Sequence, residues 1–165
     1  MDSVTIGQTF EVALAAERAM ERVFRGCAIK FAAHAELAPF WDHYAQDEVM
    51  HAEYLERLRI RLPAEKLARP TDERTVANLR AVSAFSVEKA LAGVHNLEDA
   101  YQLIHELESG ETNAIFEFLL INFETDKRMA AFLRTQLNQH VNHLQSDLPV
   151  QYQDATARQM VQATD

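Results

Sequence analysis

The sequence predicts an all-α protein, and its composition, length and apolar spacing support this together. Of the 165 residues only four are glycine and four are proline, while alanine, leucine and glutamate are abundant. β-Branched residues never form a strand-like run, so helix is the expected state. The length suits a single domain with a sizeable core. We expect a four-helix bundle over residues 1–146 and a C-terminal tail over residues 147–165.

The first two helices are expected to form an antiparallel hairpin. Thr5 and Gln8 have the spacing of a capping box, and apolar residues then recur on one helix face, which predicts a helix over residues 6–33. Pro39 suits a first helical turn and Pro63 stops a helix, so we place the second helix at residues 39–62. The link between these helices is short, so they should lie side by side.

The second half of the chain predicts a long crossover followed by two more helices. Residues 63–86 contain Pro70 and a short amphipathic piece, which together are too long for a tight turn. We expect this segment to run the length of the bundle. The third helix should extend from Ser86 to Glu108, followed by a tight turn at residues 109–113 and a fourth helix over residues 115–144.

The composition excludes several classes of protein. The formal net charge is −9 and the basic residues are scattered, which argues against a nucleic-acid surface and favours cationic partners such as metal ions. Cys27 is the single cysteine, so an internal disulfide, a zinc ribbon and a Cys-x-x-Cys iron site are excluded. The sequence shows neither a secretory signal nor a membrane span of about 20 apolar residues. We therefore expect a cytoplasmic protein.

Two polar residues interrupt an apolar face of the second helix. Glu48 and His51 lie at helical steps of three and four from Tyr44 and Leu55, in a stripe that is otherwise apolar or aromatic. A buried carboxylate or imidazole must be neutralised, paired or bound to a cation. The Glu-x-x-His spacing lets both side chains reach one metal ion. A core histidine bonded to a neighbouring carboxylate is the alternative interpretation.

Other glutamates repeat this pattern. Glu17 lies on the apolar face of the first helix, and Glu98 lies on that of the third. Glu124 should be level with Glu98 across the predicted turn, although a surface pair with Lys127 or Arg128 would also explain it. Such a ring of acids would repel itself without cations. Carboxylates with imidazole suit iron, manganese or zinc.

The ordered set resembles the rubrerythrin branch of the ferritin-like diiron proteins, whose helices contribute Glu, Glu-x-x-His, Glu and Glu-x-x-His in turn. The resemblance spans residues 6–144 and is clearest in residues 17–24, 40–51, 98–101 and 115–124. It implies a ferritin-like four-helix bundle with a long crossover between the second and third helices. It also implies one or two iron ions per chain, with manganese or zinc as alternatives. The implied ligands are Glu17, Glu48, His51, Glu98 and Glu124.

The last family position differs, because Lys127 stands where the pattern expects histidine. A protonated ammonium cannot bind a metal. Lys127 would either point inward and replace the second cation, or turn outward and leave that position to water. His95 is either a substitute ligand or a flank residue, and His105 is a candidate for a supporting contact. Tyr44 and Tyr101 lie near the expected centre and are either hydrogen-bond donors to carboxylates or core aromatics. The other histidines are expected to be surface or structural residues: His34, His43, His140 and His143.

The resemblance implies a peroxidase or ferroxidase that acts on peroxide or dioxygen, as a homodimer. Since no rubredoxin-like segment is present, electrons would come from a separate donor protein or from the iron itself. The alternative is a ferritin-like binding or scaffold protein that holds one metal or none and has no redox turnover. Lys127 is the main support for that alternative.

Overall fold

The computed structural model describes residues 3–164, which form α-helices joined by turns, with two 3₁₀ turns and no strand. The predicted all-α class is therefore confirmed. Two isolated bridges, Thr5 to Pro70 and Asn96 to Gln162, tie the helix connections together. None of the described helices has both the length and the apolar composition that a membrane crossing requires.

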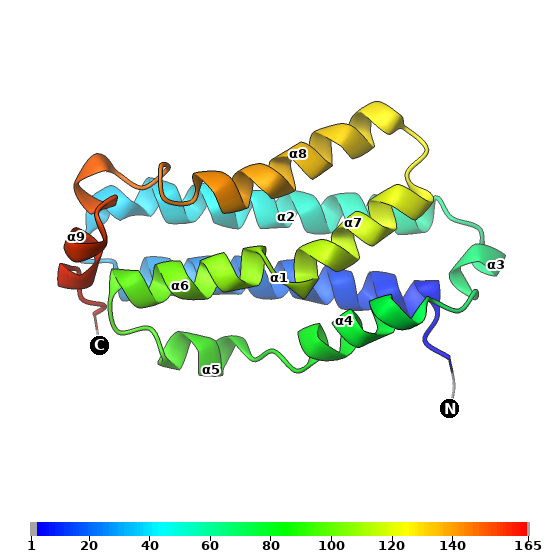
Figure 1. Ribbon diagram of the computed structural model, residues 1–165, viewed down its shortest axis with the longest axis horizontal. Helices are drawn as coiled ribbons and strands as arrows, with labels where there is room; N and C mark the ends of the chain where they lie inside the picture. Colours follow the sequence, from blue (N-terminus) through cyan, green and yellow to red (C-terminus); the bar gives the residue numbers. More distant parts are fainter. Residues whose placement is uncertain (1–2, 165) are drawn as a thin grey trace.

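The predicted hairpin is present as α1, Ile6–Lys30, and α2, Ala38–Ile60, which run antiparallel (Figure 1). The capping box at Thr5 forms as expected, since its hydroxyl accepts from the Gln8 N–H while the Gln8 side chain accepts from the Thr5 N–H. A 3₁₀ turn, Ala35–Leu37, joins the two helices and buries Leu37 completely. Pro39 lies in the first turn of α2, as its fixed φ favours.

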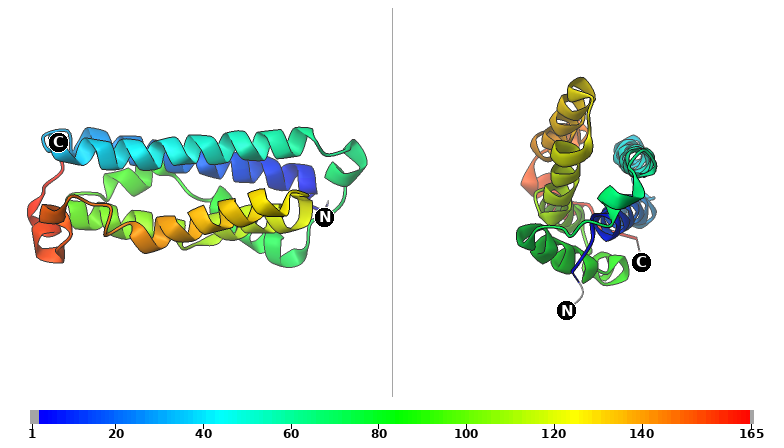
Figure 2. Two further views of the ribbon diagram at one scale, coloured as in Figure 1. Left: turned by 90° about the horizontal axis from the view of Figure 1, so that it is seen from above. Right: turned by 90° about the vertical axis from the view of Figure 1, so that its right-hand side faces the viewer.

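The crossover consists of α3, Ala64–Leu67, α4, Glu73–Ser83, and α5, Val87–Ala92. Together α4 and α5 carry the chain back along the bundle (Figure 1). Seen end on, α1 and α2 lie on one side, α7 and α8 on the other, and α4 and α5 at the bottom (Figure 2). The crossover is therefore largely helical, and it extends through α5 to Ala92 rather than ending at residue 86 as predicted.

The predicted third helix, from Ser86 to Glu108, was wrong, because its first part belongs to the crossover and the chain reverses direction before its second part (Figure 1). α5 ends at Ala92, and α6, Leu97–Glu108, begins after an irregular segment at residues 93–96. Asn96 caps α6 by accepting from the Asp99 N–H at 2.9 Å. This cap starts a new helix, so the apolar periodicity of residues 87–94 does not continue into α6.

The predicted reversal near Gly110 was also wrong. α7, Glu111–Phe123, continues in the direction of α6, and the chain turns back only at residues 124–126 into α8, Lys127–His143 (Figure 1). Gly110 has φ −96° and ψ −154°, an extended conformation that shifts the helix axis without reversing it. Asp126 caps α8 by accepting from the N–H groups of Arg128 and Met129.

The C-terminal tail packs against the start of α6. It contains a 3₁₀ turn, Val150–Tyr152, and a short helix α9, Ala155–Met160. Arg158 donates to the Glu98 carboxylate at 2.7 Å, and the Leu97 N–H donates to the Val161 carbonyl. The tail therefore covers one end of the bundle.

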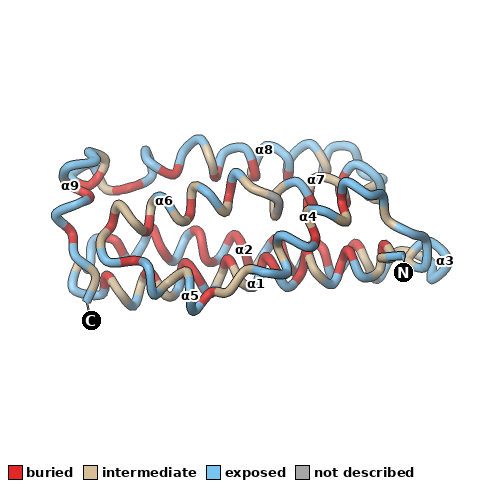
Figure 3. The backbone as a smooth tube through the Cα atoms, turned by 60° about the horizontal axis from the view of Figure 1, so that its bottom comes forward, coloured by how far each residue is buried: buried red, intermediate tan, exposed pale blue. Residues whose placement is uncertain are grey.

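The apolar core is divided into two clusters along the bundle axis. One lies toward α9 and includes Met20, Ala45, Ile104 and Leu144. The other lies toward α3, and the residues that mark its inner boundary are Leu14, Ala52, Ile115 and Leu137. Red buried positions continue through the region between the two clusters (Figure 3). Between the two clusters, α1, α2, α6 and α8 each contribute buried polar side chains.

Candidate metal centre

The hairpin of α1 and α2 contributes three buried polar residues to the middle of the bundle. Glu17, Glu48 and His51 are 2 %, 2 % and 1 % exposed. His51 Nδ1 lies 3.4 Å from Glu17 Oε2 and 3.5 Å from Glu48 Oε2. The sequence prediction that these three residues share a buried face agrees with their positions.

Two further residues reach the same place from α6 and α8. Glu108 is 3 % exposed and His140 is 5 % exposed. His140 Nδ1 lies 3.6 Å from Glu48 Oε1 and 3.8 Å from Glu108 Oε1. One potential ligand atom from each of Glu48, His51 and His140 lies within 4.8 Å of the other two. We call Glu17, Glu48, His51, Glu108 and His140 the central cluster.

Helical spacing explains why each side chain points inward. Glu17 follows the buried Leu14 by three residues and precedes the buried Met20 by three. His140 lies between Leu137 and Leu144 on the buried face of α8 in the same way. Residues three or four apart share one face, so the apolar neighbours that hold each helix in place also turn its polar residue into the core.

Several atoms of the central cluster lack hydrogen-bond partners within the protein. One carboxylate oxygen each of Glu17, Glu48 and Glu108, both ring nitrogens of His51, and Nδ1 of His140 are buried without one. A buried polar group with no partner costs about 1–3 kcal/mol, and more when it is charged. The concentration of such atoms in one place means that the cluster could hold a cation.

The pKa directions reflect this crowding. Burial, together with the nearby carboxylates of Glu108 and Glu17, raises the pKa of Glu48 well above its ordinary value. Burial lowers the pKa of His51, but the adjacent carboxylates of Glu17 and Glu108 outweigh it and raise that pKa overall. Burial likewise opposes ionisation of His140, yet the carboxylates of Asp47 and Glu108 raise its pKa to about 10. The acids and imidazoles thus compete for protons that a metal ion would replace.

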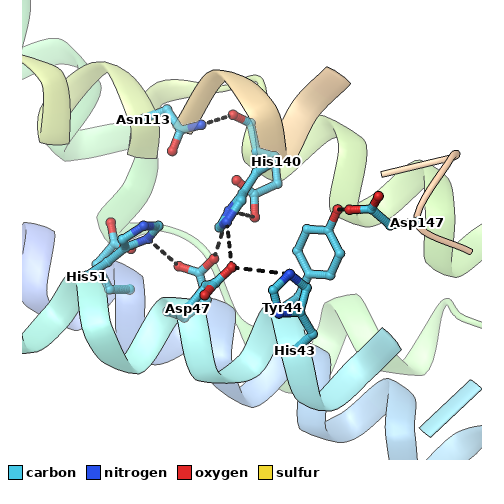
Figure 4. Close-up of polar contacts among 10 residues, drawn as sticks. His43, Tyr44, Asp47, His51, Asn113, His140 and Asp147 are labelled. Carbon is cyan, nitrogen blue, oxygen red and sulfur yellow. Dashed lines mark hydrogen bonds and ion pairs between the residues drawn. The ribbon is translucent and has the colours of Figure 1, made fainter. Parts of the chain in front are cut away.

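Asp47 holds the imidazole of His140 from outside the central cluster. His140 Nε2 lies 3.0 Å from Asp47 Oδ2, so the ring donates from Nε2 and directs Nδ1 toward Glu48 and Glu108 (Figure 4). Although burial raises the pKa of Asp47, the His140 imidazole lowers it overall. Exposed His43 approaches the same carboxylate at 3.7 Å. A histidine held this way has a fixed orientation for metal binding.

Comparison of the chain with protein-family models, curated proteins and solved structures finds no match. The chemistry must therefore be inferred from the side chains themselves. Three carboxylates and two imidazoles are a donor set for iron(II), manganese(II) or zinc. With ligand bonds of about 2.0–2.2 Å, the ligand atoms of Glu48, His51 and His140 would have to move closer together than their present spread of up to 4.8 Å to hold one ion.

The structure places the other predicted residues of α6 near the bundle end rather than in the central cluster. Glu98 pairs with Arg158, whose guanidinium also lies 4.4 Å from the Tyr101 ring centre. His105 stacks on Tyr101. His95 is exposed in the loop before α6. These positions follow from the new helix start at residue 97, which turns Ala100, Ile104 and Glu108 inward instead.

Glu124 and Lys127 also lie away from the central cluster. Glu124 ends α7, where it accepts hydrogen bonds from the Tyr54 hydroxyl and from Arg61. Lys127 is exposed at the start of α8, 13 residues before His140 and so about 20 Å away along the helix. It is therefore too distant to replace a second cation. Tyr44 does contact the His140 ring, but its hydroxyl donates to Asp147.

Sequence reasoning missed Glu108, His140 and Asp47. His140 carried a usable signal, since Leu133, Leu137 and Leu144 surround it at helical steps on one face. Glu108 would have required the break at residues 93–96, which Asn96 followed by two acids indicates. Asp47 carried no such signal, because its partner lies 93 residues away in the sequence.

Proposed function

We propose that this chain is a ferritin-like protein that binds divalent transition-metal ions at the central cluster. One observation carries the proposal: five buried acids and imidazoles from four helical segments meet between two apolar clusters, with unpartnered atoms facing one another. Without a bound metal, the carboxylates of this group are balanced by protons on the buried imidazoles and on Glu48, which a metal ion would replace. A bound cation explains why these residues occupy the core.

The resemblance to the rubrerythrin pattern supports this proposal once the second half of the pattern is assigned to different residues. The order Glu, Glu-x-x-His, Glu, Glu-x-x-His corresponds to Glu17, then Glu48 with His51, then Glu108, and then His140. The departure from the pattern is Leu137, which stands three residues before His140 where the family has glutamate. Glu98, Glu124 and Lys127 have no part in this revised set.

Within this proposal we favour iron and a rubrerythrin-like peroxidase or ferroxidase activity. When bound, iron supplies one-electron redox chemistry toward peroxide or dioxygen. The chain's own residues would hold the ions: Glu48 and Glu108 each lie within 4 Å of His140 and would supply carboxylate oxygens. A separate electron-donor protein, a homodimer and a cytoplasmic location belong to the same proposal.

Leu137 favours a second candidate function. A donor set with one carboxylate fewer binds a second ion more weakly, so the chain would hold a single metal as a carrier or scaffold without redox turnover. Metal stoichiometry and turnover separate the two functions. Near two irons per chain with peroxide consumption supports the enzyme, whereas one metal and no consumption supports the carrier.

The matched variants His140→Ala and His143→Ala test the centre itself. Both remove an imidazole from α8, but His143 is exposed and outside the central cluster. After anaerobic loading with Fe(II), His140→Ala should bind metal about 100-fold or more weakly, since even supporting residues cost 10–100-fold. His143→Ala should bind as the natural protein does. Equal metal content in the two variants would overturn the proposed centre.

A further inference from the structure

A cavity between α7 and α8 reaches the central cluster. Its volume is about 260 Å³, and Glu108 forms part of its wall. Glu108 is buried and its Oε1 has no hydrogen-bond partner in the protein. At the edge, Asn113 on α7 donates from its amide to the Glu108 backbone carbonyl (Figure 4). The cavity is therefore lined by a residue of the central cluster, Glu108.

The two halves of the central cluster differ at this cavity. In the first half, Glu48 lies one helical turn before His51 and supplies a carboxylate beside Glu17. In the second half, the residue one turn before His140 is Leu137, which has no donor atom and lines the cavity. The second half thus provides one carboxylate where the first provides two. The cavity leads to the place where the missing carboxylate would be.

Charge favours an anion at this position. Two divalent ions would carry one positive charge more than the carboxylates of Glu17, Glu48 and Glu108 that face them. Arg134 also lines the cavity, where it is paired with Glu117 at 2.7 Å and half exposed. The amides of Asn113 and Asn138 add neutral hydrogen-bonding groups to the same wall.

We propose that this cavity binds a small organic acid, whose carboxylate completes the metal site in place of the acid that Leu137 does not supply. The inference rests on the proposed metal binding. Ala114, Leu137 and Val141 provide an apolar wall for the short hydrocarbon part of the acid. The volume suits an acid of a few carbon atoms and not a long-chain one.

Acetate and the cobalt-loaded protein provide the test. Co(II) bound by carboxylates and imidazoles has a visible spectrum that changes when its ligands change. Acetate should alter the spectrum of the natural protein saturably, whereas uncharged acetamide at the same concentration should not. Leu137→Glu supplies the carboxylate internally and should weaken acetate binding at least tenfold. Gln139→Glu adds the same charge at an exposed neighbouring position outside the cavity, and should retain binding within about twofold.

Two surface variants keep the test informative if Leu137→Glu does not fold. Arg134→Gln removes the positively charged side chain that lines the cavity and should weaken acetate binding about threefold. Glu117→Gln removes the carboxylate that pairs with Arg134 and should strengthen acetate binding by a similar factor. Cobalt binding without a saturable acetate response, or an equal response to acetamide, would overturn the inference alone. A natural protein that binds no cobalt would overturn the metal proposal, and this inference with it.

Discussion

At the scale of single residues, the central cluster depends on side chains that do not themselves face the proposed ion. Asp47 is the clearest case, because its contact with His140 selects the ring nitrogen that faces Glu48 and Glu108. Tyr44 also contacts the His140 ring, with ring centres 5.2 Å apart and ring planes inclined at 61°. The His140 imidazole is thus in contact with both a carboxylate and an aromatic ring.

We predict that Asp47→Ala weakens metal binding about 10–100-fold, because His140 would lose its fixed orientation. Asp42→Ala is the matched control, since Asp42 is exposed on the same helix. Isothermal titration with zinc should show the loss only in the first variant. Equal affinities in both would mean that packing alone orients His140.

At the scale of elements, the breaks between helices decide which residues face inward. Each new N-cap begins a helix whose inward-facing positions do not follow from those of the preceding helix. Asn96 has this role for α6 and Asp126 has it for α8. The corner between α7 and α8 is held by Glu124, whose side chain is 1 % exposed and 2.8 Å from Arg61. Burial raises the pKa of Glu124, but Tyr54, the Asp126 N–H and Arg61 lower it overall.

We predict that Glu124→Gln costs about 1 kcal/mol of stability at pH 7 and progressively less in acid. The folded-state pKa lies below the unfolded value of about 4.3, so the stabilising effect is present above that pH and lost as the pH falls through the folded value. Urea unfolding at pH 7 and pH 3 measures the difference. Exposed Glu53→Gln is the control. A cost independent of pH would show that the charge of Glu124 is unimportant.

Two glycines lie in different surroundings, one in a closely packed helix contact and the other in an open turn. A Cβ at Gly26 would lie 2.3 Å from Leu91 Cδ1, where α1 meets α5, so we predict that Gly26→Ala destabilises by about 1 kcal/mol. Gly93 has φ −82° and a nearest neighbour at 3.5 Å, so Gly93→Ala should stabilise by about 0.4–1 kcal/mol. Thermal unfolding of both variants checks the opposite signs. Two stabilising changes would contradict the packing of α1 against α5.

At the scale of the whole molecule, a buried polar layer divides the apolar core. A cation that binds this layer only in the folded chain would stabilise the protein by mass action. The molecule thus combines two apolar ends with a buried polar centre.

We predict that Glu48→Gln raises the melting temperature of the metal-free protein at pH 8 by about 2–4 °C, the shift expected for about 1 kcal/mol. The raised pKa of Glu48 means that its ionised form is unfavourable in the core. The same variant should lose the stabilisation that added metal confers on the natural protein. Calorimetry with EDTA and with zinc measures both effects, and the exposed Glu56→Gln should show neither. A lower metal-free melting temperature for Glu48→Gln would contradict the prediction.

The sequence by itself determined the helical class, the α1–α2 hairpin and the inward faces of Glu17, Glu48 and His51. These residues lie on uninterrupted helices, where spacing along the sequence correctly predicts which residues share a face. Tertiary structure decided the rest. Whether the chain reverses at Gly110 or only shifts the helix axis there depends on what α7 packs against. After each break between helices, the positions that face inward can no longer be counted from the preceding helix. Glu108 and His140, on separate helices beyond those breaks, could be assigned to the centre only when the packing of α6 and α8 brought them to Glu48.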